Sequence, residues 1–137
     1  MISHNFNQVE EPDGFNAIRK WIRIVAKELF PSHAEICYVY CSDDDLLALN
    51  NDVLQHDYYT DILTFDLRDK ASDPLSCEIY ISIDRVAENA TSFNCTFAQE
   101  LKRVMVHGLL HLSGMNDSTE NEKLAMRAAE NKYINSI

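Results

Sequence analysis

The first long hydrophobic pattern along the chain has the spacing of one face of a helix. Phe15, Ile18 and Ile22 recur every three or four positions, and polar residues fill the intervening places. Residues 14–30 are therefore predicted to form an amphipathic helix, with Asp13 as its N-cap.

Strands alternate with further helices along the rest of the chain. β-Branched and aromatic residues dominate three segments, 36–41, 62–67 and 78–83, which predicts three strands, and residues 2–8 are a weaker candidate for an edge strand. Helices are expected over residues 43–51, 84–91 and 97–112, and from a capping box at Thr119-x-x-Glu122 through Tyr133. This alternation predicts an α/β or α+β fold with helices packed on a small sheet, in a single domain of residues 1–137.

The charge balance restricts how the protein can bind its partners. The chain has 12 Lys and Arg against 22 Asp and Glu, a formal net charge of −10. Such a balance argues against a protein that holds nucleic acid by bulk electrostatic attraction. Arg19, Arg23 and Lys27 nevertheless stand four residues apart on the first predicted helix. They form either a solvated polar face or a local surface that faces RNA.

Targeting and redox features point to the cytoplasm. The N-terminal segment lacks the basic and apolar regions of a signal peptide, and no apolar run is long enough to span a membrane, so no membrane partner is expected. The four cysteines (Cys37, Cys41, Cys77 and Cys95) are expected to stay thiols in a reducing cytoplasm.

The residues with the strongest chemical pattern lie between positions 104 and 118. His107 and His111 stand four apart on a predicted helix, so both imidazoles share one face and can bind one metal ion. Gly114 follows as a helix stop, and Asp117 comes three residues later. The pattern H-x3-H-x2-G-x2-D has the spacing of the long zincin signature, whose third ligand is normally a histidine. It predicts a zinc-like site formed by His107, His111 and Asp117.

Gly108, directly after the first histidine, bears on the class of reaction. Zinc proteases of the H-E-x-x-H type place their general base, a glutamate, at this position, so proteolysis by that mechanism is not expected. A glycine inside a helix costs about 1 kcal/mol relative to alanine. We interpret it as leaving room beside the metal for substrate or water, where a metal can activate water or polarise a phosphoryl oxygen.

Three motifs resemble those of a known family. Residues 107–117, HGLLHLSGMND, resemble the metal motif H-G-x-L-H-L-x-G-Y-D-H of the YbeY-type endoribonucleases, also called ribosomal RNA maturation factors. Residues 60–65 and 77–81 are similar to two further family motifs, T-N/D-V-L-S-F and G-D-I-x-I, in the same order. The resemblance implies a mixed sheet of about four strands with surrounding helices. It also implies one zinc-like ion at His107, His111 and Asp117, and metal-dependent cleavage of single-stranded RNA. Ribosomal RNA and the small ribosomal subunit are the implied partners, in ribosomal RNA maturation and ribosome quality control.

The chain departs from the family pattern at two positions. Asp117 stands where the family has its third histidine, which lowers the charge of the site by one, and we expect metal binding to be retained. Leu54 stands where the family has an arginine thought to assist with the RNA phosphate. Four residues are interpreted either as substitutes for that arginine or as ordinary surface residues: Arg85, Lys102, Arg103 and His56.

Two carboxylates complete the candidate site. Asp61 and Glu78 are interpreted either as groups that transfer protons or orient a metal ligand, or as residues that pack or cap at strand ends. We therefore predict catalytic roles for Asp61, Glu78 and Arg85. Two other functions remain as alternatives: a non-catalytic ribosome-assembly factor with a structural metal, and a metal-dependent hydrolase of another substrate.

Overall fold

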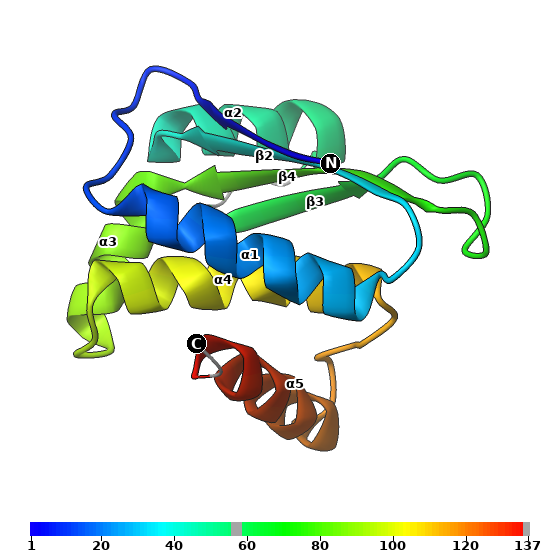
Figure 1. Ribbon diagram of the computed structural model, residues 1–137. Coiled ribbons are helices and arrows are strands. Elements are labelled where there is room, and N and C mark those ends of the chain that lie inside the picture. The colour runs from blue at the N-terminus through cyan, green and yellow to red at the C-terminus, as the bar shows by residue number, and fades with distance from the viewer. Residues whose placement is uncertain (56–58, 136–137) are drawn as a thin grey trace.

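The computed structural model describes residues 1–55 and 59–135. In chain order its elements are β1 (Ile2–Phe6), α1 (Phe15–Leu29), β2 (Ala34–Cys41), α2 (Asp43–Leu54), β3 (Ile62–Asp66), β4 (Leu75–Ser82), α3 (Ile83–Ser92), α4 (Phe97–Leu112) and α5 (Glu120–Ile134). The strands form one sheet, with α2 on one face and α1 and α4 on the other, while α5 lies against α4 (Figure 1). This arrangement confirms the predicted α/β fold with four strands in the described part of the chain.

The sheet is mixed, and its strand order is β1-β2-β4-β3. β1 and β4 run parallel to β2, whereas β3 runs antiparallel to β4. β3 is therefore an edge strand. Helix α4 packs against β3, so the residues of α4 lie beneath this edge of the sheet.

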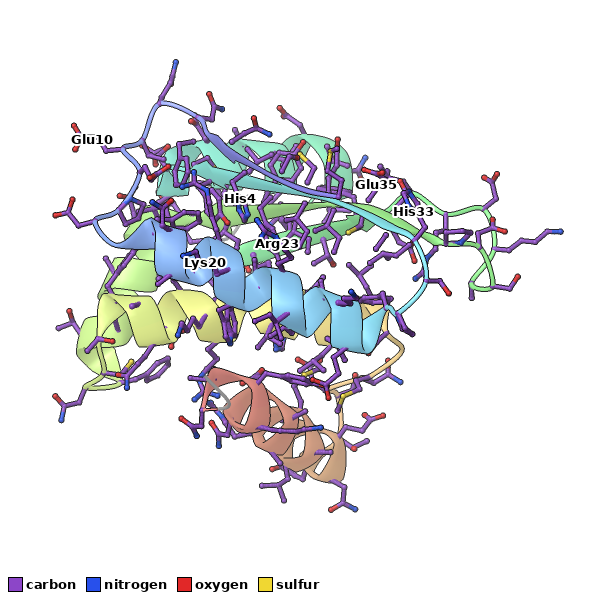
Figure 2. All side chains as sticks on the ribbon, viewed as in Figure 1. His4, Glu10, Lys20, Arg23, His33 and Glu35 are labelled. Atoms are coloured by element: carbon purple, nitrogen blue, oxygen red, sulfur yellow. The ribbon has the colours of Figure 1, made fainter. Side chains whose placement is uncertain are left out.

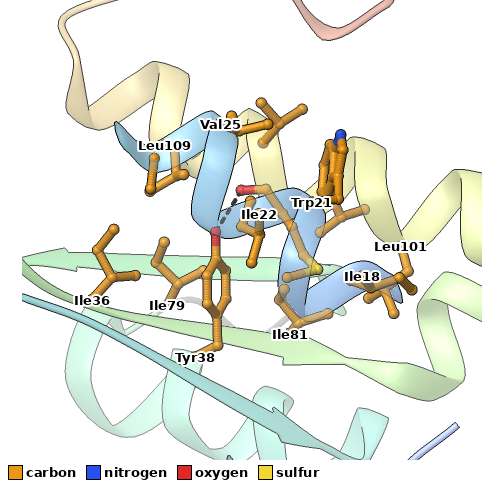
Figure 3. Packing of buried hydrophobic residues seen from close by; sticks show 14 of the residues in the cluster. Ile18, Trp21, Ile22, Val25, Ile36, Tyr38, Ile79, Ile81, Leu101 and Leu109 are labelled. Carbon is orange, nitrogen blue, oxygen red and sulfur yellow. Dashed lines mark hydrogen bonds between the residues drawn. The ribbon is translucent and has the colours of Figure 1, made fainter. Parts of the chain in front are cut away.

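The main hydrophobic core fills the space between the sheet and helices α1 and α4 (Figure 3). Tyr38, Ile79 and Ile81 point from the sheet into this layer and are fully buried. The Tyr38 hydroxyl donates a 3.0 Å hydrogen bond to the Met105 carbonyl of α4. Burying each large apolar side chain contributes about 1.5–3 kcal/mol, so the core fixes α4, and with it the two histidines, against the sheet.

The N-terminus of α1 differs from the sequence prediction. Gly14, not Asp13, is the N-cap, and it has the left-handed conformation with φ +75°. No side chain caps the helix there. The Phe15 N–H instead bonds to the Pro12 carbonyl at 3.3 Å, so a turn at Pro12 leads the chain into the helix. The prediction of Asp13 as N-cap was wrong because glycine allows this backbone turn.

Strand β4 begins at Leu75, three residues before the predicted start at position 78. It pairs with β2 over eight residues, from Ala34 opposite Leu75 to Cys41 opposite Ser82. The early residues were missed because the polar Ser76 interrupts the hydrophobic run, although alternate residues of β4 point into the core.

The cysteines of the described residues form no disulfide. All four cysteines are free thiols, with Cys41 and Cys77 buried. Cys37 and Cys41 share a strand but belong to no group of metal-binding side chains that the described ranges contain. None of the helices described has both the length and the apolar character needed to cross a membrane.

Candidate metal centre

Two histidines of α4 and an aspartate beyond its C-terminus converge on one point. Nε2 of His107 lies 3.6 Å from Oδ2 of Asp117, and Nε2 of His111 lies 3.4 Å from the same oxygen. All three ligand atoms lie within 4.8 Å of one another. Ligands bound at about 2.0–2.1 Å to a tetrahedral ion are about 3.3 Å apart, so this spacing fits a single ion.

Hydrogen bonds to the other ring nitrogens set the orientation of both histidines. Nδ1 of His107 donates to Oε2 of Glu130 at 2.7 Å, and Nδ1 of His111 donates to the Met115 carbonyl at 3.0 Å. Because each Nδ1 carries the hydrogen, each Nε2 presents its lone pair toward Asp117. Two imidazoles and a carboxylate held in this way have the donor chemistry and the tautomers of a zinc site.

A turn at the end of α4 brings the third ligand to the helix. Gly114 has φ +109°, as its predicted role as helix stop requires. Its N–H bonds to the His111 carbonyl at 3.0 Å, and the Met115 N–H bonds to the Leu110 carbonyl at 3.1 Å. This pair of bonds is the Schellman motif. It turns the chain so that the Met115 carbonyl meets His111 and Asp117 returns to the two imidazoles.

Glu130 of α5, which the sequence analysis missed, supports the centre from beneath. Its side chain is only 6% exposed and also accepts a hydrogen bond from Nη1 of Arg103 at 2.8 Å. Burial acts to raise the pKa of Glu130, but the bonds from His107 and Arg103 outweigh it and hold that pKa below its ordinary value. The available signal was a glutamate on the buried stripe of α5, between Met126 and Tyr133.

Gly108 serves close packing rather than substrate access. A Cβ at this position would lie 3.0 Å from Cδ1 of Ile62 and 3.2 Å from Cγ2 of Thr64. The glycine therefore lets α4 approach β3 and β4 closely. The interpretation that it leaves room for substrate was wrong, because this position faces the sheet and the interpretation considered only the neighbouring histidine.

Comparison with known proteins identifies the family. The family profile described as "Endoribonuclease YbeY" matches residues 2–137. The chain belongs to the YbeY family.

Curated relatives and a solved structure agree with this assignment. The chain is 44% identical over 139 residues to "Endoribonuclease YbeY" of Phocaeicola vulgatus, covering 98% of this chain and 96% of the relative. It is 48% identical over 117 residues to the protein of that name from Cytophaga hutchinsonii, covering 85% and 81%. The solution structure of TM1509 from Thermotoga maritima is similar with a TM-score of 0.66 and 27% identity, covering 98% of this chain and 89% of that one.

Of the other residues proposed for the YbeY-type site, Asp61 shares a cavity with one member of the triad, His107. Asp61 precedes β3. Burial raises the pKa of Asp61, and the charge of His107 acts in the opposite direction.

The structure does not bring Glu78 or Arg85 to the triad. Glu78 lies on β4 between residues that point into the main core, so its side chain is on the opposite face of the sheet. The Arg85 guanidinium binds Asp43, with 2.7 Å between Nη2 and Oδ2, and lies over the Tyr59 ring. Both placements depend on long-range packing.

Two of the remaining candidates to replace the YbeY-type arginine have partners away from the triad or beside it. Arg103 is held by Glu130 and Asn131, and the Lys102 ammonium lies over the Trp21 ring. Leu54 is the last residue of α2. His56 lies outside the described residues.

The basic residues of α1 divide into two groups. Arg19 pairs with Glu11 and lies over the Phe15 ring. Arg23 and Lys27 line a cavity of about 480 Å³ next to the start of β2, which contains no member of the triad. Figure 2 labels Arg23 on α1 and, beyond the end of that helix, His33, which pairs with Glu35 and lines the same cavity as Arg23. That this stripe faces RNA stays a prediction.

Proposed function

We propose that the protein is a zinc-dependent endoribonuclease that cleaves single-stranded RNA, with ribosomal RNA as its substrate. The observation that carries this proposal is the convergence of two histidine Nε2 atoms on the Asp117 carboxylate, with both Nδ1 atoms already held. The match to the family described as "Endoribonuclease YbeY" supports the reaction class. The resemblance of the motifs also supports an association with the small ribosomal subunit and a place in the cytoplasm.

The donor set and its accessibility favour a catalytic rather than a structural ion. His107, His111 and Asp117 would hold the ion, and two imidazoles with one carboxylate suit zinc. A divalent ion supplies Lewis-acid activation of water and of a phosphoryl oxygen. The three side chains are 25%, 32% and 41% exposed, so RNA can reach them, whereas structural zinc sites are closed by four protein ligands.

The residues around the triad have distinct parts in this proposal. Glu130 and the Met115 carbonyl orient the imidazoles. Asp61 is the carboxylate placed to accept a proton in the cavity beside His107. Arg127 is exposed, lines this cavity and also lines a second one that Asp117 borders, so its guanidinium can face an RNA phosphate.

The test combines metal content with RNA cleavage. Purified wild type and His111→Ala are compared for bound zinc and for the time course of cleavage of a single-stranded RNA. We expect His111→Ala to lose zinc and at least about 100-fold in cleavage rate, since residues that merely orient a ligand already contribute 10–100-fold. His33→Ala, which removes an exposed histidine outside the triad, is the matched control and should behave as wild type.

Two results would replace the proposal. Zinc binding by wild type with equal slow RNA cleavage by wild type and His111→Ala would favour the assembly factor with a structural metal. A zinc-dependent activity on another phosphoester, with RNA left intact, would favour the hydrolase of another substrate.

A further inference from the structure

The cavity that Asp61 and His107 line extends away from the other two metal ligands toward the first turn of α4. It has a volume of about 220 Å³ and is bordered by the start of β3, by α3, α4 and α5. His107 is part of its lining, so whatever occupies it lies next to a candidate metal ligand. The volume is below the roughly 300–1,000 Å³ of pockets for drug-sized ligands, and suits one small flat group.

Glu100, in the first turn of α4, is the residue in this cavity that calls for explanation. It is only 4% exposed, yet no residue within 1–55 or 59–135 donates a hydrogen bond to its carboxylate or forms an ion pair with it. The nearby Arg103 is occupied by Glu130 and Asn131. Burial, with the neighbouring charge of Asp61, raises the pKa of Glu100, and the charges of Arg103 and Arg127 act in the opposite direction. The Glu100 oxygens are not among the fully buried unpaired atoms of the described residues, so they face the cavity, where a ligand that brings its own donors can reach them.

The helix dipole does not account for the burial of Glu100. An acidic residue in the first turn of a helix is favourable, but the effect is available to an exposed side chain as well. Glu120 occupies the first turn of α5 and is exposed. The burial of Glu100 therefore has a cause other than capping.

The other lining residues describe the occupant. Ile62 and Val104 offer apolar surface, and Phe93, whose side chain is 62% exposed, borders the cavity with a free aromatic face. A carboxylate accepts hydrogen bonds and cannot donate when ionised, so an uncharged occupant has to present hydrogen-bond donors to it. A nucleobase combines flat faces that stack with an edge that carries hydrogen-bond donors. Such bases in single-stranded RNA stack on aromatic side chains and are recognised along their edges.

We propose that this cavity, the Glu100 pocket, receives the base of one nucleotide of the RNA strand and prefers guanine. Guanine presents N1–H and N2–H₂ side by side, which match the two oxygens of the Glu100 carboxylate. Phe93 stacks on the base, and Arg127 faces the phosphate of the same nucleotide. The inference rests on the proposed function only for the strand to which the base belongs. Binding of the nucleotide itself is independent of cleavage.

Nucleotide binding tests the Glu100 pocket without any reaction. Guanosine, adenosine, cytidine and uridine 5′-monophosphates are titrated separately into the full-length zinc-loaded protein and followed by ¹H–¹⁵N NMR. All four share the phosphate, so differences among them report the base. We expect guanosine monophosphate to bind at least about tenfold more tightly than the others. Its shifts should centre on Glu100, Phe93 and Val104.

Two variants with matched controls identify the residues responsible. Glu100→Gln should remove the preference for guanine, because an amide replaces one acceptor with a donor, whereas Glu10→Gln removes the same charge from an exposed residue and should keep the preference. Phe93→Ala alters an exposed side chain, so the variant should fold normally, and its affinity for all four nucleotides should fall by about tenfold. Val53→Ala is its control.

Each contrary result is informative. Equal binding of the four nucleotides, or a guanine preference unchanged in Glu100→Gln, would overturn the proposal. Binding of Mg²⁺ to the Glu100 pocket without nucleotide binding would show a cation site instead. Cleavage of RNA with no preference among the nucleotides would contradict the Glu100 pocket and leave the nuclease function supported. Guanine-selective binding without RNA cleavage would support the Glu100 pocket and contradict the nuclease function.

Discussion

Replacing Glu130 with glutamine tests whether α5 tunes the metal centre. The carboxylate accepts two hydrogen bonds, from Nδ1 of His107 at 2.7 Å and from Nη1 of Arg103 at 2.8 Å. An amide has one oxygen, so Glu130→Gln can accept only one of them and turns its NH₂ toward the other donor. Breaking a buried ion pair typically costs about 3–5 kcal/mol. Because Arg103 is 24% exposed and keeps Asn131 as an acceptor, we expect the free energy of unfolding without metal to fall by about 2–3 kcal/mol.

The same change should weaken zinc binding. His107 then faces either the amide NH₂ or a neutral amide oxygen in place of the carboxylate that fixes its tautomer, and losses of this kind typically cost about 10–100-fold in metal affinity. Urea unfolding of the metal-free protein gives the first quantity, and competition with a chromophoric chelator gives the zinc Kd. Glu28→Gln, which loses only a 3.7 Å surface pair with Lys132, is the control. If Glu130→Gln is destabilised but binds zinc like wild type, Glu130 only joins two helices and the reasoning is refuted.

Three further predictions concern the turn, the third ligand and the sheet. Gly114→Ala should lower the free energy of unfolding by about 1–3 kcal/mol and also weaken zinc binding. Gly14→Ala, which also changes a glycine at positive φ, should lower the free energy of unfolding without affecting zinc binding. Urea unfolding measures the first quantity, and competition with a chelator measures the second. Asp117→His, which removes a negative charge from the site, should shift the pH–rate profile of RNA cleavage to lower pH, and an unchanged profile would contradict the assigned ligand. Burial, aided by the charge of Arg19, lowers the pKa of His4 to about 4 from 6.5, so its contribution to stability is complete above pH 6.5 and declines as the pH falls toward 4. Between pH 7 and pH 4.5, the free energy of unfolding of His4→Phe, measured in urea, should therefore fall by about 1–2 kcal/mol less than that of wild type. An equal fall in the two proteins would refute the lowered pKa of His4.

Much of the metal centre is predictable because its parts are close in sequence. His107, His111, Gly114 and Asp117 span eleven residues, and helix periodicity plus one glycine turn suffices to bring the three ligands together. The alternation of strands and helices likewise predicts the fold class, since each element shows its own periodicity.

The rest of the site depends on packing between distant elements. Glu130 lies 23 residues after His107, and only the docking of α5 against α4 decides that the two meet. Arg85 meets Asp43 across 42 residues in the same way. Gly108 indicates a close approach, but only the structure shows that the partner is β3. Hydrophobic patterns define which face of a helix is buried, and they do not specify which residue it meets.

The contact between α5 and His107 makes metal occupancy and helix docking a linked equilibrium. Glu130 orients a ligand, and the same helix is anchored to α1 by a 2.8 Å hydrogen bond from Nε1 of Trp21 to the Tyr133 carbonyl. If docking of α5 strengthens ion binding through the orientation of His107, then ion binding strengthens docking of α5 by the same free energy. A metal ion bound at the triad would therefore suppress the local opening in which α5 leaves the body of the protein, and its removal would favour that opening. The stability with which α5 docks therefore depends on the ion. Amide hydrogen exchange or proteolysis of α5 reports whether the metal centre is occupied.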